Sequence, residues 1–333
     1  MPNSWVVGLC WTYAVAVVAI GIQNATGPER SWWAGINMFL PQLLWAIPGV
    51  ILFPLTVWRA RVWSWVPLAA MAYVFLSLMG FSWANPAPAE GTPLRVMTYN
   101  VQLWQRRTVG AILEEIRLAD PDILCLQDAY GATRGRVGEY LRSRHVAAFG
   151  QYVIASRFPV VRSVAGDISY RGERHTYLRA QIDVTGQIVT IVSAHFVTPR
   201  DALGTLRAAS LWGTGVSLTK QNLSDRIVQG RALANDLGKI DGPIIVAGDL
   251  NAPPSSLATR ALTDRGLADA FSASGRGYGY TFGHTLVAGY SFLRIDRILV
   301  SRHFRPSRTW VGGSDGSDHR PVIAEVTLQS ERR

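Results

Sequence analysis

The hydrophobic pattern divides the chain into a front part with long apolar runs and a longer part with short ones. The long runs cover Trp5–Gln23, Trp32–Val57 and Val62–Trp83. Because a bilayer core is roughly 30 Å thick and a helix rises about 1.5 Å per residue, about 20 apolar residues form one crossing. The only formally charged side chains before residue 82 are Glu29, Arg30, Arg59 and Arg61. The pattern therefore predicts three transmembrane helices within residues 1–84.

The loops between these runs set the expected orientation. The second loop carries Arg59 and Arg61, whereas Glu29 and Arg30 cancel in the first loop. Basic loops stay in the cytoplasm, so we expect the N-terminus inside and the part after the third run outside. The first run alone is similar to a signal peptide, but it has no basic n-region and two further spans follow it.

From Leu94 onward, short β-rich runs alternate with helical ones. The predicted strands are Leu94–Val101, Asp122–Gln127, Gln151–Ser156, Thr176–Val184, Gln187–His195, Pro243–Ala247, Ile295–Ser301 and Pro321–Leu328. Helical periodicity covers Val109–Leu118 and about Leu223–Leu237. This mixture predicts one α/β domain over residues 94–330, built as two packed sheets flanked by helices. Residues 85–93 are rich in Pro and Ala and predict a short, semi-rigid linker.

Charge and cysteine content add limits to this picture. The chain has a net charge of +10, and the 30 basic and 22 acidic residues after residue 81 leave +8 on the second part. A basic surface favours polyanions, either nucleic acid or anionic lipid head groups, and charge alone does not choose between them. Cys10 and Cys125 are interpreted as two buried small residues, which leaves the redox compartment open.

Polar residues interrupt the predicted strands at or just past their ends. They are Asn100, Asp128, His195, Asp249, Asn251, Asp296, Asp318 and His319. Each of them alone is commonly a turn former or an ordinary histidine. Together they are rich in oxygen, with two histidines and no cysteine, which is typical of a site for a hard cation such as Mg²⁺ and of phosphoryl chemistry.

Six short motifs that contain these residues are similar to one family. The motifs are TYN (98–100), DILCLQD (122–128), SAHF (193–196), GDLN (248–251), IDRILVS (295–301) and SDHRPV (317–322). In this order they resemble the endonuclease/exonuclease/phosphatase superfamily over nearly all of residues 94–328. The resemblance implies a DNase I-like fold, a four-layer α/β/β/α sandwich, with the site at one edge of the two sheets.

The resemblance also implies catalytic roles. His319 would be the general base that deprotonates the attacking water, and Asp296 would hold its other ring nitrogen. Asp249 and Asn251 would position the water and the scissile phosphate. His195 would donate to a phosphate oxygen as negative charge develops there.

A divalent metal ion, Mg²⁺ in the first instance, is implied in the same way. Its expected ligands are Asn100, Asp128 and Asp318, and the ion would offset negative charge on the phosphoryl oxygens. The family usually has glutamate where this chain has Asp128, which is one methylene shorter. Because Mg²⁺ requires ligand distances of about 2.0 to 2.1 Å, the shorter side chain leaves the larger Mn²⁺ as an alternative.

Three membrane helices before an outward-facing catalytic domain resemble the VanJ-like, teicoplanin-resistance members of the superfamily. That resemblance implies a phosphatase of undecaprenyl-type lipid pyrophosphates at the outer face of the bacterial cell membrane, with antibiotic resistance as its context. The expected partners are an anionic, lipid-linked phosphoester and the membrane, with nucleic acid less favoured and no protein partner evident. Residues 198–222 mix apolar and basic side chains, which suits either a lid over lipid or a helical hairpin packed on the core. Arg171, Arg174 and Arg179 either clasp a diphosphate or lie in solvent.

Three rival functions stay open. An exported DNase I-like nuclease would use the same residues, although a membrane tether limits its reach and no strand surface lined by aromatic residues is evident for stacking bases. A sphingomyelinase-type phospholipase C would differ only in which side of the phosphate leaves. A catalytically inactive membrane scaffold is favoured by the short Asp128 and opposed by retention of both histidines.

Overall fold

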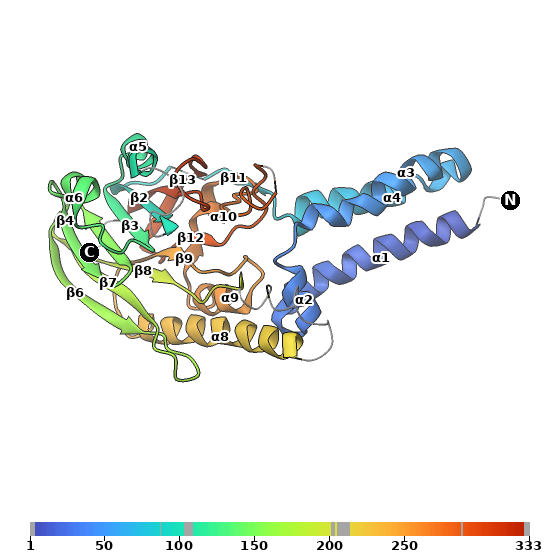
Figure 1. Ribbon diagram of the computed structural model, residues 1–333. Helices are drawn as coiled ribbons and strands as arrows, with labels where there is room; N and C mark the ends of the chain where they lie inside the picture. The colour runs from blue at the N-terminus through green and yellow to red at the C-terminus, as the bar shows by residue number, and fades with distance from the viewer. Residues whose placement is uncertain are drawn as a thin grey trace. The chain divides into compact units, whose positions relative to one another are not determined.

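The computed structural model describes residues 4–86, 88–102, 109–200, 204, 214–287 and 289–329. The chain forms two compact units, Met1–Ser82 and Trp83–Arg333. The first unit consists of helices, and the second combines strands with helices (Figure 1).

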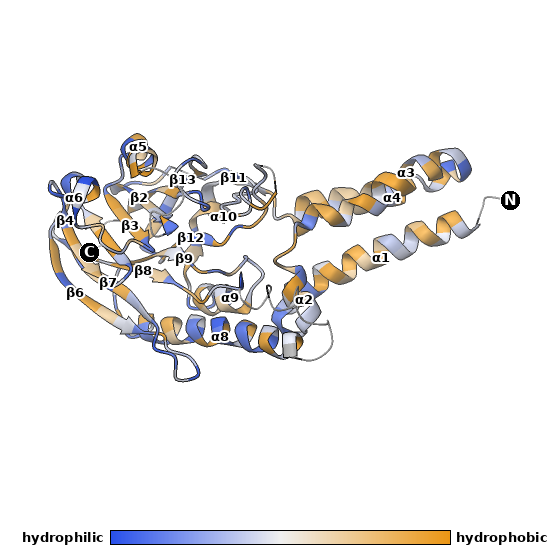
Figure 2. Ribbon diagram, viewed as in Figure 1, coloured by the Kyte–Doolittle hydropathy of each residue, from blue (hydrophilic) through white to orange (hydrophobic). Residues whose placement is uncertain are grey.

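Apolar helices make up the first unit. They are α1 (Ser4–Thr26), η1 (Pro28–Arg30), α2 (Trp32–Asn37), η2 (Gln42–Ala46), α3 (Ile47–Arg59), η3 (Arg61–Trp63), α4 (Trp65–Tyr73) and η4 (Val74–Leu78). Three stretches are long and apolar enough to cross a membrane, namely Ser4–Thr26, Gln42–Arg59 and Arg61–Leu78. Helix α1 packs against α3 and α4, and hydrophobic residues dominate all three helices (Figure 2). Val15 and Ile51 are exposed, as expected for side chains that face lipid.

The second and third candidate membrane spans have other bounds than the pattern predicts. Trp32–Asn37 forms a separate short helix, and the second candidate span begins only at Gln42. Pro41 stands between them, and a proline and the residue before it disfavour a continuous helix. The third candidate span ends at Leu78, whereas Trp83 lies in the short strand β1 (Ser82–Trp83).

Two six-stranded sheets form the centre of the second unit. One sheet has the order β10 (Ala268–Asp269), β12 (Asp296–Val300), β9 (Ile244–Asp249), β8 (Gln187–His195), β7 (Thr176–Val184) and β6 (Val160–Asp167). The other has the order β13 (Phe304–Val311), β14 (Val322–Leu328), β2 (Thr92–Asn100), β3 (Ile123–Gln127), β5 (Tyr152–Ser156) and β4 (His145–Phe149). The short strand β11 (Arg276–Gly277) belongs to neither sheet.

Helices cover the outer faces of the two sheets. Helices α5 (Val109–Ala119) and α6 (Gly135–Leu141) pack on the sheet that contains β2, and α8 (Thr214–Leu237) and α9 (Leu257–Thr263) pack on the sheet that contains β9. A third apolar cluster fills the space between the sheets. The short helix α10 (Ala270–Ser274) contacts β12 and β13. The predicted four-layer α/β/β/α sandwich is confirmed (Figure 1).

Burial on both faces explains the continuous apolar runs. Val96 of β2 faces the layer between the sheets, whereas its neighbour Met97 packs with helix α5. A strand that is buried on both faces loses the alternation of apolar and polar residues. Strands β4, β6 and β13 escaped prediction because exposed side chains interrupt them.

Helix α8 begins at Thr214, nine residues before the predicted start at Leu223. The predicted lid covers residues 198–222, and its last part, from Thr214 onward, is therefore helical. The exposed Leu218 lies in this helical part. Residues 201–203 and 205–213 of the predicted lid lie outside the described part of the chain.

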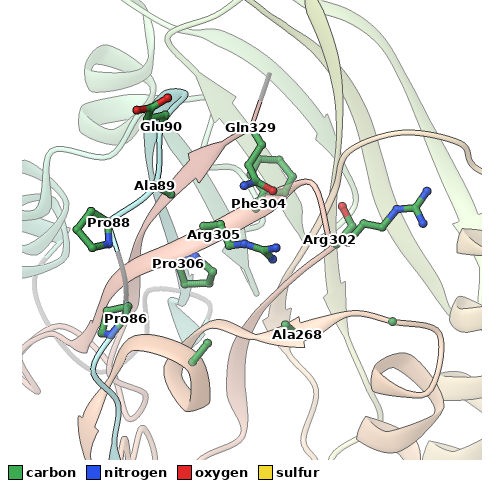
Figure 3. Close-up of a pocket in the computed structure, with 13 residues that line it drawn as sticks. Pro86, Pro88, Ala89, Glu90, Ala268, Arg302, Phe304, Arg305, Pro306 and Gln329 are labelled. Atoms are coloured by element: carbon green, nitrogen blue, oxygen red, sulfur yellow. The ribbon is translucent and has the colours of Figure 1, made fainter. Parts of the chain in front are cut away.

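The segment before β2 lies along the second unit. The N–H of Ala84 donates to the carbonyl oxygen of Gly275 at 3.2 Å. Further along, Pro86, Pro88 and Glu90 line a cavity of about 850 Å³ together with residues of β10 and β13 (Figure 3). Most of the predicted linker, residues 85–93, is thus packed on this unit, and β2 already begins at Thr92.

Candidate active site

Strand pairing brings the polar strand ends to one edge of the sandwich. β2 and β3 are parallel with Asn100 opposite Gln127, and β8 and β9 are parallel with His195 opposite Asp249. β12 runs antiparallel to β9, and its first residue, Asp296, is opposite Asp249. Residues from distant parts of the sequence therefore meet at this edge, as the sequence predicts. The cavity of Figure 3 lies at the opposite ends of β12 and β14, so it is separate from this site.

Asp249 is the centre of the contacts. Its Oδ2 accepts a hydrogen bond from Nδ2 of Asn100 at 3.0 Å, and its Oδ1 accepts one from the backbone N–H of Asn251 at 2.8 Å. The same Oδ2 lies 3.5 Å from Nε2 of His195 and 3.6 Å from Nε2 of His319. Burial raises the pKa of Asp249, and the charge of Asp296 adds to the rise. A buried carboxylate needs such partners to stay charged.

His319 and Asp296 form a buried pair. Nδ1 of His319 lies 2.8 Å from Oδ2 of Asp296, and the ring of Phe282 packs on the imidazole with 4.9 Å between ring centroids. Burial lowers the pKa of His319, but Asp296 and Asp249 outweigh burial and raise it to about 10. The pairing fixes the imidazole with Nε2 turned toward Asp249, which is the geometry that a general base requires.

His195 lies on the other side of Asp249. Its Nδ1 makes a 2.7 Å hydrogen bond with Oε1 of Gln151 and lies 3.5 Å from Oδ1 of Asp128. Burial lowers the pKa of His195, but Asp128 and Asp249 outweigh burial and raise it. For the carboxyl group of Asp128 burial acts in the opposite direction and raises the pKa. The hydrogen bond and charge of His195 outweigh burial and leave the pKa of Asp128 below its ordinary value. A protonated His195 can donate to an anionic oxygen.

Asp318 is held from two sides. Its Oδ2 accepts from Nη2 of Arg200 at 3.2 Å, and its Oδ1 accepts from the hydroxyl of Ser317 at 3.4 Å. The Arg200 side chain is 60% exposed, so part of its guanidinium faces solvent above the buried carboxylate. The charge of Arg200 also lowers the pKa of Asp128. Arg200 therefore brings positive charge to the rim of an acidic site.

The donor set at this edge fits a divalent cation. One carboxylate oxygen each from Asp249 and Asp296 and one ring nitrogen of His319 lie within 4.8 Å of one another. Oδ1 of Asp296 is buried and has no hydrogen-bond partner within the described part of the chain. Buried carboxylate oxygens without donors are ligands that hard cations prefer. The ligands expected from the sequence, Asn100, Asp128 and Asp318, stay a prediction.

Three of the six residues other than glycine that have a positive φ in the described part of the chain lie at or next to the site. Gln102, Asp128 and Asn251 have positive φ values of 45°, 50° and 46°. Such conformations cost energy in residues other than glycine and are commonly found at functional sites. Gly248 is required for another reason, since a Cβ at this position would lie 1.9 Å from the carbonyl oxygen of Ala194 in the parallel neighbour strand. The close approach of β8 and β9 sets the distance between His195 and Asp249.

The three arginines predicted to bind a diphosphate have different surroundings. Arg171 makes hydrogen bonds of 2.7 and 2.6 Å to both carboxylate oxygens of Asp225 in helix α8. Arg179 lies 3.6 Å from Asp236 of the same helix, and Arg174 is exposed. The ion pairs connect the region before and within β7 to α8. Substrate binding by these arginines stays a prediction.

Sequence reasoning missed three residues that shape the site. Gln127 accepts from the hydroxyl of Thr98 at 3.2 Å and donates to the hydroxyl of Ser193 at 2.9 Å, so it joins the two sheets below the site. The available signal was a glutamine that directly continues the apolar run at residues 123–126 of a predicted strand. Gln151 and Phe282 carried no such signal, because their roles depend on which histidine lies beside them.

Comparisons with known proteins agree with this geometry. The sequence model of the Endonuclease/Exonuclease/phosphatase family matches residues 97–319. No curated protein matches the sequence.

Solved structures share the fold of the second unit. An endonuclease/exonuclease/phosphatase from Beutenbergia cavernae is 21% identical over 72% of each chain, with a TM-score of 0.54. A mannosyl-6-phosphatase from Bacteroides thetaiotaomicron is 17% identical over 70% of this chain and 99% of its own, with a TM-score of 0.54. D. rerio TDP2 complexed with single strand DNA product is 18% identical over 71% of this chain and 99% of its own, with a TM-score of 0.54.

Proposed function

The chain belongs to the endonuclease/exonuclease/phosphatase family, and from that premise we propose a membrane-anchored, metal-dependent phosphoesterase that hydrolyses a lipid-linked pyrophosphate of the undecaprenyl type. Phosphoester hydrolysis is the activity of the family, so the lipid, the metal and the membrane are the added parts of the proposal. The observation that carries it is the buried line of contacts from Asp296 through His319 to Asp249.

These side chains supply the proton chemistry of hydrolysis. Asp296 accepts from Nδ1 of His319, so Nε2 is the nitrogen that takes a proton from water. The water oxygen then bonds to phosphorus while the bond from phosphorus to the leaving phosphate oxygen breaks. Asp249 lies between both histidines and orients the water, and His195 donates a hydrogen bond to a phosphoryl oxygen.

Carboxylates at the same edge would hold the cation. Asp128 and Asp318 with Asn100 are the proposed ligands, and Mg²⁺ or Mn²⁺ suits their oxygens. A cation held by His319 together with Asp249 and Asp296 would occupy Nε2, the nitrogen that has to take the proton in this proposal. When bound, the ion supplies positive charge that offsets charge on the phosphoryl oxygens and lowers the pKa of His319 toward the range of a general base. Arg200, already in contact with Asp318, adds a fixed cation for the same oxygens.

Three features support a lipid substrate at the outer face of the bacterial membrane. The first unit has three stretches with the length and hydropathy of membrane crossings. The basic loop with Arg59 and Arg61 favours a cytoplasmic N-terminus, which puts the catalytic unit outside. The net charge of +8 after residue 81 attracts anionic head groups.

A substrate panel tests the proposal. The purified full chain in detergent receives undecaprenyl pyrophosphate, a choline phospholipid or plasmid DNA, with and without chelator. We expect phosphate release from the pyrophosphate, its loss with chelator, and its loss in His319→Ala and Asp249→Ala. Nicked plasmid without phosphate release would establish a nuclease. Release of phosphocholine would establish a phospholipase C, and no turnover of any substrate would establish an inactive scaffold.

A further inference from the structure

One loop beside the catalytic pair carries no charge and exposes large apolar side chains. Residues 277–293 contain no Asp, Glu, Lys or Arg, in a chain with a net charge of +10. Within this loop Leu286 is 66% exposed and Val287 is 43% exposed. Neighbouring exposed apolar residues without a charge among them are typical of a contact surface.

This loop is joined directly to the catalytic residues. The ring of Phe282 packs on the imidazole of His319, and the backbones of the two residues form an isolated antiparallel β-bridge. His284 continues the connection, because its Nε2 lies 3.2 Å from the carbonyl oxygen of Ser317. Leu286 and Val287 follow four and five residues after Phe282, and two and three residues after His284. A ligand whose phosphate lies at His319 can therefore extend onto these apolar side chains.

The loop has a defined conformation. The N–H groups of Leu286 and Val287 donate to the carbonyl oxygen of Gly283 at 2.8 and 3.0 Å, and that of Tyr290 donates to Val287 at 2.6 Å. Gly283 has a φ of 117°, and a Cβ there would lie 2.5 Å from the ring of Phe292. Because the turn is closed by its own hydrogen bonds, the apolar side chains are presented before any ligand arrives.

Aromatic rings extend the surface away from the site. Tyr280 contacts Tyr290 edge to face at 6.5 Å and stacks on Tyr278 at 5.2 Å. Two residues before Tyr278, the guanidinium of Arg276 lies 5.7 Å from the ring of Trp83, the first residue of this unit. The three tyrosine rings thus form one continuous set of contacts within the same loop as Leu286 and Val287.

We propose that this apolar track, formed by Leu286, Val287, Tyr290, Tyr280 and Tyr278, binds the hydrocarbon chain of the substrate while its phosphates lie at His319. The proposal rests on the proposed function, since it names the subsite that makes that activity selective for lipid. A hydrocarbon chain is favoured over nucleic acid because Tyr278 and Tyr280 stack on each other and because none of the five side chains of the track is a cation that could bind a phosphate backbone.

The first test compares two pyrophosphates with different chains. Farnesyl pyrophosphate has fifteen chain carbons and isopentenyl pyrophosphate has five, while their phosphate chemistry is the same. In the full chain, Leu286→Ser with Val287→Ser should lower kcat/KM for the farnesyl compound about tenfold or more and that for the isopentenyl compound less than twofold. The matched control is Leu118→Ser with Val161→Ser, which removes apolar side chains that are 73% and 61% exposed elsewhere. Equal losses on both substrates, or no loss on either, would overturn the proposal.

The second test reads binding without turnover. A Leu286→Cys variant in lipid nanodiscs is labelled with an environment-sensitive fluorophore, and the native Cys10 and Cys125 are both buried. We expect a blue shift with farnesyl monophosphate and none with inorganic phosphate or an oligodeoxynucleotide. A shift already present before ligand is added would assign the loop to the bilayer surface, and a shift with the oligonucleotide alone would assign it to nucleic acid; either result overturns the proposal. A farnesyl-dependent shift in a protein that hydrolyses no pyrophosphate would support the subsite and refute the proposed function. Turnover of pyrophosphate without a shift would support the proposed function and refute the subsite.

Discussion

Replacing Asp296 by asparagine removes the charge that orients His319 and keeps the rest of the site in place. Nδ1 of His319 lies 2.8 Å from Oδ2 of Asp296, and both side chains are buried. Asparagine has nearly the same shape, but its amide can donate to Nδ1 and so stabilise the wrong tautomer. In that tautomer Nε2 carries the proton and cannot accept one from water.

The expected loss follows from this geometry. A buried hydrogen bond to a charged group contributes about 1.5–3 kcal/mol, which corresponds to roughly 10-fold to 150-fold in rate. The wrong tautomer adds to this, as it does when the aspartate of a catalytic triad is replaced, so we expect kcat to fall about 10²-fold to 10⁴-fold. KM should change little, because Asp296 has no direct contact with substrate in the proposed mechanism.

Two measurements check the prediction. The first is kcat for phosphate release by Asp296→Asn, His319→Ala and the double variant, with the exposed Asp264→Asn as control. Because the pair acts as a unit, the double variant should be no slower than His319→Ala. The second is the pKa of His319, measured by NMR in the presence of a chelator. It should fall from about 10 in the wild type toward the ordinary value in Asp296→Asn, because Asp296 no longer raises it. A kcat within threefold of wild type in Asp296→Asn would refute the catalytic role of the pair.

Three further outcomes are expected. Gly248→Ala should lower the free energy of unfolding by about 1–3 kcal/mol, measured with denaturant, because the new methyl group meets a backbone carbonyl of β8 at 1.9 Å; unchanged stability would show that the strands can separate freely. Asp269→Asn should cost about 3–5 kcal/mol, read as a lower unfolding temperature, because it leaves the buried Arg297 without its ion pair. Burial raises the pKa of Asp269, but the neighbouring arginines lower it overall, so its contribution is present above the unfolded pKa and is lost as pH falls through the folded pKa; the variant should lack that part of the acid sensitivity. Asp128→Asn and Asp318→Asn should each weaken Mn²⁺ binding at least tenfold by calorimetry, and equal affinity in both variants and wild type would move the metal to the other carboxylates.

Much of the fold could be predicted because burial on both faces leaves a simple pattern. Strands β7 and β8 have the predicted bounds, since β7 alternates buried apolar with less buried polar residues toward Val184 and β8 is buried along most of its length. Strand β6 is largely exposed and carries no such pattern, so only its pairing with β7 makes it a strand. Helix α8 was predicted too short because the apolar and basic residues around Leu218 suit a lid as well as a helix.

The candidate site was predictable in its members and less so in their contacts. The positions of the strand ends predicted which side chains lie close together, because parallel strands bring their carboxyl ends to one edge of the sheet. His195 and Asp249 are an example. Which partner each side chain has depends on the distance between strands that are remote in sequence. The bond between His195 and Gln151 and the pairing of Arg171 with Asp225 are of this kind. The helix bounds near Trp32 and Leu78 likewise depend on local backbone geometry that hydropathy does not report.

The hydrogen bond between Ala84 and Gly275 shortens the free segment that connects the two units. Only the residues between Leu78 and Trp83 are left to span from the last apolar helix to the catalytic unit, at most roughly 18 Å when fully extended. If the apolar helices cross a bilayer, as the proposed function requires, so short a connection would give a high effective concentration toward molecules in the same bilayer and no such gain toward molecules in bulk solution. An enzyme held in this way would sample neighbouring lipids repeatedly, at the expense of any polymer that must diffuse to it.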